Sequence, residues 1–414
     1  MAAPVSEPAE SLPLTRRALE EPLCDTCLGR LFGAPPKGAT SAHRGKRLRD
    51  SVGGAQTDPA LCPLCEGTCG EFDALTKLAA DALEGYEFDT LLVGTTVDAV
   101  LARRESEYAA GLGLSSIHTL KQEVNREVGL RLEASLSKTV DFLDPDIAVH
   151  LDSRFNTVSL QVKSAYFRGR YRKLARGIPQ TRWPCRSCRG RGCGRCQGTG
   201  KMYGESVEEF VARPLMEALG GKEHALHGAG REDVDARMLG RGRPFIVEVR
   251  APKRRTLDLE AAEASINGAA AGRVEVSELA PCRKEAVAAL KDADWQKTYR
   301  VLVALEKAIK DDPINRACAE LTGCVIDQQT PARVSHRRAD MVRKRKAVLV
   351  RLKSLADTTA ELEVRGESGL YVKELIHGDE GRTKPSFSEL LGVHCTVLEL
   401  DVLEIHDNPE GENP

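Results

Sequence analysis

Two aspartates lie close together in the segment GREDVDARMLGRGRPF, residues 230–245. Asp233 and Asp235 are two positions apart, and the same segment contains four arginines. An ionised carboxylate can act as a nucleophile or as a general base, and a neighbouring cation helps to keep it ionised. The plainer alternative is an arginine-rich loop whose acids are solvated. The sequence therefore offers one candidate for carboxylate chemistry.

Eight of the thirteen cysteines form four CxxC pairs, which is typical of metal ligands in a reducing compartment. Two such pairs supply the four sulfurs of a closed, structural zinc site with no open coordination position. We therefore expect one or two structural Zn²⁺ ions. The first expected site consists of Cys24, Cys27, Cys62 and Cys65, and the second of Cys185, Cys188, Cys193 and Cys196.

The second cluster is a tandem CxxCxGxG repeat, whose glycines permit the tight turns that bring sulfurs together. The pattern resembles the zinc repeats of DnaJ-type chaperones, but the His-Pro-Asp tripeptide of a J domain is absent from the chain. Two redox pairs are the other alternative, and a four-sulfur zinc site is favoured because both pairs lie in one short stretch. Cys69 is left over and is expected to be a free or core thiol.

The net charge of −1 conceals a strongly basic block. Residues 161–201 contain twelve lysines and arginines and no acid. Such a block favours binding to the phosphates of a nucleic acid. The alternative is a solvated segment whose balancing acids lie elsewhere in the chain.

The length of 414 residues predicts two or three domains. No apolar run is long enough to cross a membrane, and the first residues have no apolar signal-peptide core, so we expect no membrane partner and a cytoplasmic protein. Neither a P-loop nor a Rossmann fingerprint is present, which argues against a nucleotide cofactor.

Hydrophobic patterns predict an α+β protein in which the second half contains a largely antiparallel sheet. A helix is expected to begin at Ser206, because Ser206 and Glu209 have the spacing of a capping box. Further helices are expected at 43–52, 72–83, 124–136 and 258–267. Strands are expected at 88–97, 146–153, 157–167, 244–252, 299–305, 346–355, 359–367 and 395–405, the second and third of them forming a hairpin.

Several of these segments resemble known RNA-modifying proteins. Residues 145–173, PDIAVHLDSRFNTVSLQVKSAYFRGRYRK, look like the end of a THUMP domain. Gly230 to Asp233 is similar to the Gly-Arg-x-Asp loop of pseudouridine synthases, and ESGLYVKELIHGDEGRTKP, residues 367–385, looks like their Gly-x-Tyr-Ile-Arg/Lys segment. In their order along the chain and in their sequences, these segments resemble the archaeal and eukaryotic tRNA pseudouridine-54/55 synthases. The CxxCxGxG pair points to the archaeal form.

The resemblance implies a role for each matching residue. Asp233 would be the catalytic aspartate, and Tyr299 would stack on the target base. Tyr371 would be the buried tyrosine beside the aspartate, and Lys373 the cation that pairs with it, where many pseudouridine synthases have arginine. Val372 and Leu400 would be apolar walls of the pocket. Asp235 does not match the motif, and we expect it to bond loop backbone or a neighbouring arginine.

The implied activity is conversion of uridine to pseudouridine in the T loop of tRNA, at positions 54 and 55. This isomerisation has no redox step and adds no group, so it needs no cofactor for catalysis. The expected partner is tRNA, and the chain is expected to act as a monomer. Two alternatives remain: another THUMP-containing tRNA-modifying enzyme, such as a methyltransferase or thiouridine synthase, and a non-catalytic zinc protein that binds tRNA.

The expected organisation follows from these motifs. It comprises a disordered leader at 1–20, a four-cysteine zinc module at 21–70, a THUMP-like RNA-binding domain at 71–180, a basic four-cysteine zinc clip at 181–203, a pseudouridine synthase catalytic domain at 204–406 and a disordered tail at 407–414.

Overall fold

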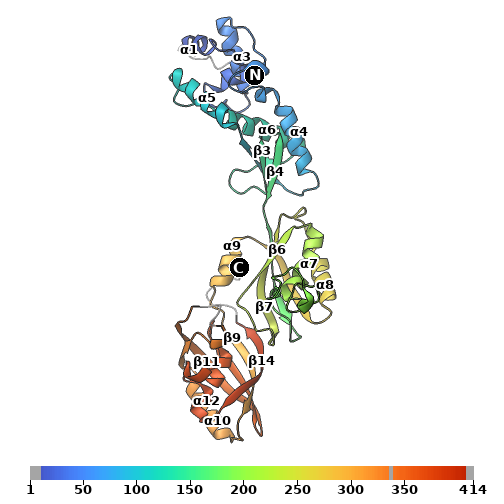
Figure 1. Ribbon diagram of the computed structural model, residues 1–414, viewed down its shortest axis with the longest axis vertical. Helices are drawn as coiled ribbons and strands as arrows, with labels where there is room; N and C mark the ends of the chain where they lie inside the picture. The colour runs from blue at the N-terminus through green and yellow to red at the C-terminus, as the bar shows by residue number, and fades with distance from the viewer. Residues whose placement is uncertain (1–10, 335–338, 407–414) are drawn as a thin grey trace. The chain divides into compact units, whose positions relative to one another are not determined.

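The computed structural model describes residues 11–334 and 339–406. The chain divides into two compact units (Figure 1). The first unit comprises residues 1–163 with 253–255, and the second comprises residues 164–252 with 256–414. Each unit has hydrophobic clusters of its own, one in the first and two in the second.

The first unit combines a helical, cysteine-bearing part with a small sheet. The sheet has the order β2-β1-β3-β4, in which β1 pairs in parallel with β2 and β3, and β3 pairs antiparallel with β4. One cluster of buried residues includes both the cysteines and the sheet. The elements are α1 (Ser11–Ala18), α2 (Asp25–Arg30), α3 (Ser41–Val52), α4 (Phe72–Leu83), β1 (Thr90–Thr96), α5 (Ala99–Gly111), α6 (Leu120–Leu136), β2 (Thr139–Val140), β3 (Ile147–Asp152) and β4 (Thr157–Val162).

The second unit is built on a ten-stranded sheet, which confirms the expected α+β class with a largely antiparallel sheet. Its strand order is β13-β10-β11-β12-β9-β14-β7-β5-β8, with β6 paired to β7. Among the described pairs of this sheet, only β7 and β14 run parallel. The strands are β5 (Ala165–Lys173), β6 (Glu223–Gly228), β7 (Arg237–Arg250), β8 (Val274–Cys282), β9 (Lys297–Leu305), β10 (Val325–Gln329), β11 (Val342–Ala356), β12 (Thr359–Gly366), β13 (Thr383–Lys384) and β14 (Cys395–Ile405).

Helices cover this sheet in two groups, one for each of the two hydrophobic clusters of the second unit. Side chains of α7 (Val207–Leu219) and α8 (Leu259–Ala270) pack with β5, β7 and β8 in one cluster. The predicted capping box of α7 is present, because Ser206 and Glu209 exchange hydrogen bonds. The second cluster contains side chains of α10 (Asp311–Leu321), α11 (Val372–His377) and α12 (Phe387–Leu391), whereas α9 (Glu285–Asp292) contributes to the first.

The predicted strand 157–167 is divided between the two units. Residues 157–162 form β4 of the small sheet, whereas Ala165 begins β5, which pairs with β7 and β8 of the large sheet. The expected THUMP-like range of 71–180 therefore extends into the second unit, which begins at Ser164. The segment has a continuous strand pattern, and its pairing partners lie far away in sequence, so the local pattern could not show the division.

The expected disordered leader also differs from the structure. Residues 11–18 form α1, in which Thr15 and Ala18 are fully buried, and Tyr108 donates a hydrogen bond to the carbonyl of Ala18. Residues 1–10 and the expected disordered tail at 407–414 lie outside the described residues. No helix in the described part of the chain combines the length and the apolar character that crossing a membrane requires.

Candidate active site

Asp233 lies on the loop of residues 229–236, which joins β6 to β7. The loop turns back on itself at Gly230, whose φ of +81° lies in the left-handed region that favours glycine. A second turn follows, in which the amide of Ala236 donates to the carbonyl of Asp233. The loop thus presents Asp233 between two turns at the start of the long strand β7.

Two cations contact the carboxylate of Asp233. The Nη1 atom of Arg333 lies 3.2 and 3.3 Å from its two oxygens, and the Nζ atom of Lys373 lies 3.2 Å from Oδ2. The Asp233 side chain is 36% exposed, so it is open to a ligand. The structure therefore brings Lys373 to Asp233, as the resemblance implies, and adds an arginine.

The second aspartate shares one of these cations. Lys373 Nζ lies 3.0 Å from Asp235 Oδ2, so the lysine bridges the two carboxylates. Burial raises the pKa of Asp235, but the hydrogen bond and the charge of Lys373, together with a backbone hydrogen bond and the charge of Lys173, outweigh burial, and the net pKa is lowered. The side chain of Asp235, expected to bond loop backbone or a neighbouring arginine, accepts a hydrogen bond from its own backbone N–H. Arg176 donates to the main-chain carbonyl of Asp235.

Arg333 is itself fixed by a buried carboxylate. Its Nε atom lies 2.7 Å from Oε1 of Glu374, whose side chain is 1% exposed. Burial lowers the pKa of Arg333, but Glu374 and Asp233 together raise it well above the ordinary value. Arg333 therefore stays charged, and Glu374 holds its guanidinium toward Asp233.

Tyr299 lies on β9 beside this cluster. Burial raises the pKa of its hydroxyl to about 12, with Asp233 adding to the rise and Arg243 opposing it. The phenol is therefore neutral at physiological pH and keeps its proton. In register, Tyr299 stands opposite Val402 of β14 and Val364 of β12.

Tyr371, Val372 and Lys373 are consecutive at the start of α11. The side-chain amide of Gln328 accepts from the backbone N–H of Tyr371 at 2.8 Å and donates to its carbonyl at 2.9 Å. Val372 is buried in the core of the second unit, and Leu400 packs against the same core. Tyr371 is the N-cap residue of α11, and Lys373, on the first turn of the helix, contacts Asp233.

A buried ion-pair network lies beneath the loop. Glu232, next to Asp233, accepts a 2.8 Å hydrogen bond from Nε of Arg243 and bonds of 2.8 and 3.0 Å from the hydroxyl of Tyr171. The side chains of Glu232 and Arg243 are each 1% exposed. Burial raises the pKa of Tyr171, so its hydroxyl remains a donor to Glu232. A charge pair this deep is stable only because each partner satisfies the other.

The same network holds the backbone of the loop at three carbonyls. Arg243 donates to the carbonyl of Ala229 at 2.5 Å, and Gln180 donates to that of Gly230 at 3.0 Å. Lys173, fully buried on β5, donates to the carbonyl of Asp233 at 3.0 Å. The position of Asp233 is thus fixed by β5 and β7 rather than by the loop alone.

Sequence reasoning had missed four of these residues: Arg333, Glu374, Glu232 and Arg243. Arg333 belongs to a run of basic residues, 333–346, in which no single arginine stands out, and His336 of that run lies outside the described residues. Glu232 and Arg243 were inside the segment quoted first. The available signal was a glutamate flanked by arginine and aspartate, but only the fold shows that it is buried.

The basic block of residues 161–201 divides into two parts. Its cations on and after β5 meet acids from elsewhere in the chain: Arg172 meets Glu275, Lys173 meets Glu232, and Arg176 meets Glu399 and Asp401. In this part of the block, acids from elsewhere in the chain balance the positive charges, as the alternative to nucleic-acid binding predicts. The part around the second cysteine cluster is different, because its arginines at 182, 186, 189, 191 and 195 are all exposed.

Both cysteine clusters are assembled in the structure, with the four sulfurs of each within 4.8 Å of one another. A tetrahedral ion with metal–sulfur bonds of about 2.3 Å places its sulfurs about 3.8 Å apart. The distance is 3.8 Å between Cys24 and Cys65, and in the second cluster it is 3.7 Å between Cys193 and Cys196. These separations fit a tetrahedral metal and are far from the roughly 2.05 Å of a disulfide.

The first cluster has two further neighbours. The Sγ atom of Cys69, expected to be a spare thiol, lies 3.8 Å from Sγ of Cys27. The guanidinium of Arg30, fully buried and paired with Glu105, donates to Sγ of Cys27 at 3.4 Å. A buried cation beside a four-thiolate metal site offsets part of its negative charge.

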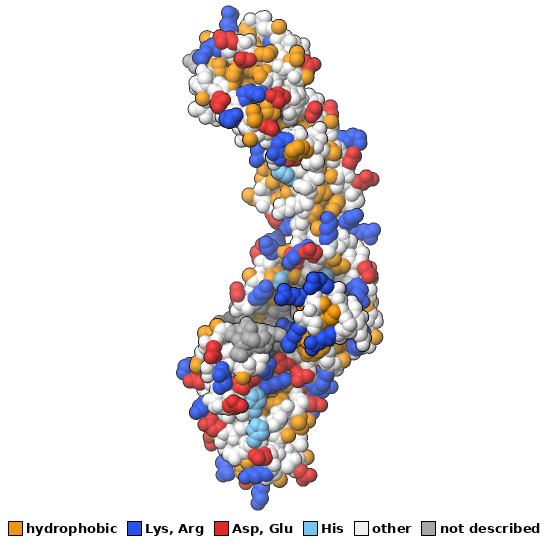
Figure 2. Space-filling view, viewed as in Figure 1, with side chains coloured by type: hydrophobic (Ala, Val, Ile, Leu, Met, Phe, Trp, Pro, Cys, Tyr) orange, Lys and Arg blue, Asp and Glu red, His pale blue; other side chains and the backbone are white. Residues whose placement is uncertain are grey.

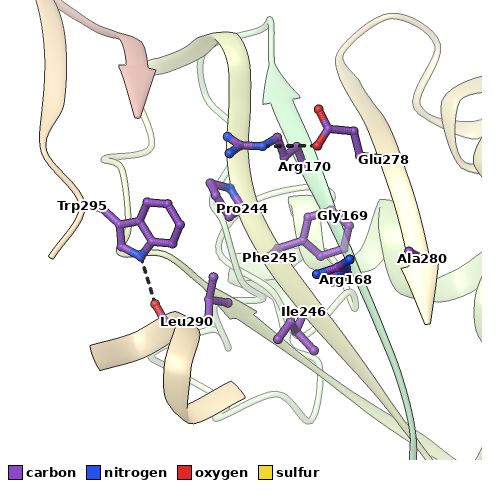
Figure 3. A pocket seen from close by; sticks show the side chains of 10 residues that line it. All are labelled: Arg168, Gly169, Arg170, Pro244, Phe245, Ile246, Glu278, Ala280, Leu290 and Trp295. Carbon is purple, nitrogen blue, oxygen red and sulfur yellow. Dashed lines mark hydrogen bonds and ion pairs between the residues drawn. The ribbon is translucent and has the colours of Figure 1, made fainter. Parts of the chain in front are cut away.

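A separate pocket of about 200 Å³ lies on β5, β7 and β8 (Figure 3). The indole of Trp295 donates to the carbonyl of Leu290 at 3.1 Å, and Arg170 pairs with Glu278 at 3.5 Å. None of the expected site residues lines it. The lining residues are Arg168, Gly169, Arg170, Pro244, Phe245, Ile246, Glu278, Ala280, Leu290 and Trp295.

The chain is similar to known proteins over most of its length. Residues 166–406 match the family described as "Pus10, C-terminal", and residues 75–152 match "Pus10 THUMP domain, archaeal". The second match lies inside the first unit, whose main segment ends at Lys163.

The chain is also similar to archaeal proteins over most of its length. The chain is 40% identical to the tRNA pseudouridine synthase Pus10 of Methanothrix thermoacetophila, over 94% of this chain and 93% of the relative. It is 41% identical to the protein of that name from Halorubrum lacusprofundi, over 94% of both chains. For Methanothermobacter marburgensis the identity is 43%, over 92% of this chain and 95% of the relative. On these matches, the chain belongs to the Pus10 family of tRNA pseudouridine synthases.

Proposed function

We propose that the protein is a tRNA pseudouridine synthase that isomerises uridine in the T loop, at positions 54 and 55, with Asp233 as the catalytic aspartate. The observation that carries the proposal is the Asp233 carboxylate, partly exposed on a braced loop and contacted by Lys373 and Arg333. Family membership supports the reaction, and the archaeal form of the resemblance supports the T-loop positions.

The reaction breaks the bond between N1 of uracil and C1′ of ribose, turns the base and forms a bond from C5 to C1′. The proton lost from C5 is balanced by the one gained at N1. Asp233 acts either as a nucleophile or as the base that takes the 2′ proton, and in both routes it reacts as a carboxylate. Lys373 and Arg333 keep that charge paired.

The target base must leave the folded RNA before it reaches Asp233. Tyr299 supplies an aromatic face for stacking, and its neutral hydroxyl adds no charge beside the uracil. Val372 and Leu400 supply apolar surface from α11 and β14. Tyr371 fixes the start of α11 through Gln328, and so fixes Lys373, two residues later.

Both four-cysteine clusters are proposed to hold structural zinc. Their sulfurs occupy all four positions of a tetrahedral ion, so neither metal takes part in the isomerisation. We expect two zinc ions per chain by elemental analysis. We further propose that the enzyme works in the cytoplasm, where its thiols stay reduced and tRNA is available.

The test uses an unmodified tRNA transcript, purified protein and no added cofactor. Pseudouridine is mapped by carbodiimide-dependent primer extension in transcripts that keep uridine at 54, at 55 or at both. Asp233→Asn should lower the rate at least ~1000-fold, as expected when a reacting group is removed. Asp235→Asn is the comparison variant, because it removes a carboxylate that also pairs with Lys373 but does not match the catalytic motif, and it should lose much less activity than Asp233→Asn.

The outcomes separate the alternatives. Equal loss of activity in both variants would show that the ion-pair cluster, rather than Asp233, is needed. Binding of tRNA with no product, even by the unsubstituted protein, would favour a non-catalytic tRNA-binding protein. Product at neither T-loop position but elsewhere in the tRNA would keep the reaction and overturn the proposed site.

A further inference from the structure

The second four-cysteine cluster lies in a segment that we call the basic knuckle, residues 181–203. It contains six lysines and arginines and no acid. Arg182, Arg186, Arg189, Arg191 and Arg195 are exposed. Figure 2 shows a group of blue side chains over the part of the view that this segment occupies. A four-thiolate zinc site has a net charge of −2, so the knuckle remains strongly positive after metal binding.

Glycines hold the two turns of the knuckle back to back. Gly192 has a φ of +90°, and a Cβ there would lie 2.8 Å from the carbonyl oxygen of Gly198. Gly200 has a φ of +68°, and a Cβ there would clash with the carbonyl of Gly190. The backbone N–H groups of Gly192 and Gly200 donate to the Sγ atoms of Cys188 and Cys196, each at 3.2 Å, so both turns are tied to the cysteine cluster from which the arginines project.

The base of the knuckle is joined to the catalytic loop. Pro184 and Lys201 form a β-bridge, and Trp183 next to it packs edge-on against Tyr203 at a ring separation of 5.5 Å. The guanidinium of Arg231 lies 5.1 Å from the centre of the Trp183 ring. Arg231 is two residues before Asp233, so Trp183 at the base of the knuckle contacts the start of the catalytic loop.

Resting on the proposed function, we propose that the basic knuckle binds phosphates of the tRNA backbone beside the nucleotide that Asp233 receives. Phosphate contacts fix the register of a nucleic acid on a protein without reading its bases. Arginine suits this task, because its planar guanidinium can donate two hydrogen bonds to one phosphate. The zinc site and the Trp183–Arg231 contact keep these donors at a fixed place relative to the catalytic loop.

A protein partner fits this surface less well. Interfaces between proteins are usually anchored by buried aromatic or aliphatic side chains. Within the basic knuckle, Met202 is the large apolar side chain with substantial exposure among the residues described. The recognisable chemistry of the surface is therefore positive charge on a rigid frame, which matches a polyanion.

The test compares two fourfold substitutions in the full-length, zinc-loaded protein. The knuckle variant replaces Arg186, Arg189, Arg191 and Arg195 with Ser. The control variant removes the same charge from exposed positions in the same unit with no role in the site, Lys307, Lys310, Arg316 and Lys353. Both are made in an Asp233→Asn background, and the Kd for tRNA is measured from 50 to 300 mM salt, with zinc content checked in each.

Each lost phosphate contact should reduce the slope of log Kd against log salt by about 0.7 to 0.9. For the knuckle variant we expect this slope to fall by about 3 and tRNA binding at low salt to weaken at least tenfold. For the control variant we expect the slope to fall by less than about 1. An unchanged slope, or equal changes in both variants, would overturn the proposal. The knuckle substitutions are also made in protein that retains Asp233. If the Kd for tRNA were unchanged there but the rate at saturating tRNA fell, the proposal would be overturned, because the knuckle would then only support the catalytic loop.

This binding test does not depend on catalysis. If the unsubstituted protein made no pseudouridine but the knuckle variant lost affinity and salt dependence, the proposed function would fail and the phosphate-binding surface would stand.

Discussion

At the scale of single residues, the site is a chain of shared charges. Lys373 serves both Asp233 and Asp235, and Arg333 serves both Asp233 and Glu374. Each cation therefore has a second acid, besides Asp233, that holds it in place. Glu374 is the buried end of this chain, and Asp235 is the exposed end.

Lys373→Met tests the proposed role of the lysine. It removes the cation from two carboxylates but keeps an apolar side chain of similar length. We expect the single-turnover rate at saturating tRNA to fall by about 10² to 10³, because charge stabilisation in a reacting site contributes on that scale. The Kd for tRNA should change less than threefold, and Lys373→Arg should recover part of the rate. A loss of affinity as large as the loss of rate would assign Lys373 to binding instead.

Glu232→Gln tests the buried network under Asp233. The substitution leaves Arg243 charged and without its partner, which costs about 3 kcal/mol for a pair buried this deeply. Tyr171→Phe is the milder companion, because it removes only the hydroxyl bonded to Glu232, at about 1 kcal/mol. Both tryptophans, Trp183 and Trp295, belong to the second unit, so urea unfolding followed by tryptophan fluorescence reports on this unit. Equal stability in all three proteins would contradict the network as described.

At the scale of elements, the sequence predicted those helices and strands whose formation depends on nearby residues. Helix α4 has the predicted bounds of 72–83, because its apolar residues recur at helical spacing, and α7 begins at its capping box. The cysteine clusters were predictable because the spacing within each CxxC pair is a local property. The division between β4 and β5 was not predictable, because β5 pairs with β7 and β8, whose paired residues come 65 to 116 positions later, as in Lys173 with Met238 and Tyr166 with Cys282.

In the candidate site, too, the sequence did not reveal contacts between residues that are far apart along the chain. The resemblance pointed to Asp233 and Lys373 through short motifs, and the structure brings these two together. Arg333 was hidden, because it lies 100 residues from Asp233 in a run of similar cations. Its partner Glu374 gives it a fixed direction, and burial of a glutamate on a short helix cannot be seen in composition or periodicity.

Gly200→Ala tests whether the knuckle depends on its turns. A methyl group at this position would meet the carbonyl of Gly190 and would need a left-handed backbone. Because zinc binding and folding of such a module are coupled, we expect at least tenfold weaker retention of one of the two zinc ions against a chelator. Gly194→Ala is the matched control, since a Cβ there has no neighbour within 4 Å and the residue needs no positive φ. Loss of zinc in both variants would contradict the role given to the turn.

At the scale of the whole molecule, each unit has its own core and its own four-cysteine cluster. The buried residues around Cys24 to Cys65 belong to the first unit, and the two clusters of the large sheet belong to the second. Metal binding should therefore stabilise each unit separately. Residues 75–152 of the first unit match the archaeal Pus10 THUMP model, and residues 166–406, which make up most of the second unit, match the Pus10 C-terminal model.

Removing one metal site at a time tests this separation. Cys62→Ser with Cys65→Ser removes two ligands of the first site, so that Cys69 cannot restore it as a single replacement. We expect one zinc per chain, an earlier urea transition by circular dichroism and an unchanged transition by tryptophan fluorescence, since both tryptophans lie in the second unit. Cys193→Ser with Cys196→Ser removes two ligands of the second site. This pair should lower the midpoint of the fluorescence transition, because Trp183 lies at the base of the knuckle. A fluorescence midpoint lowered equally by both pairs would mean that the two units unfold as one.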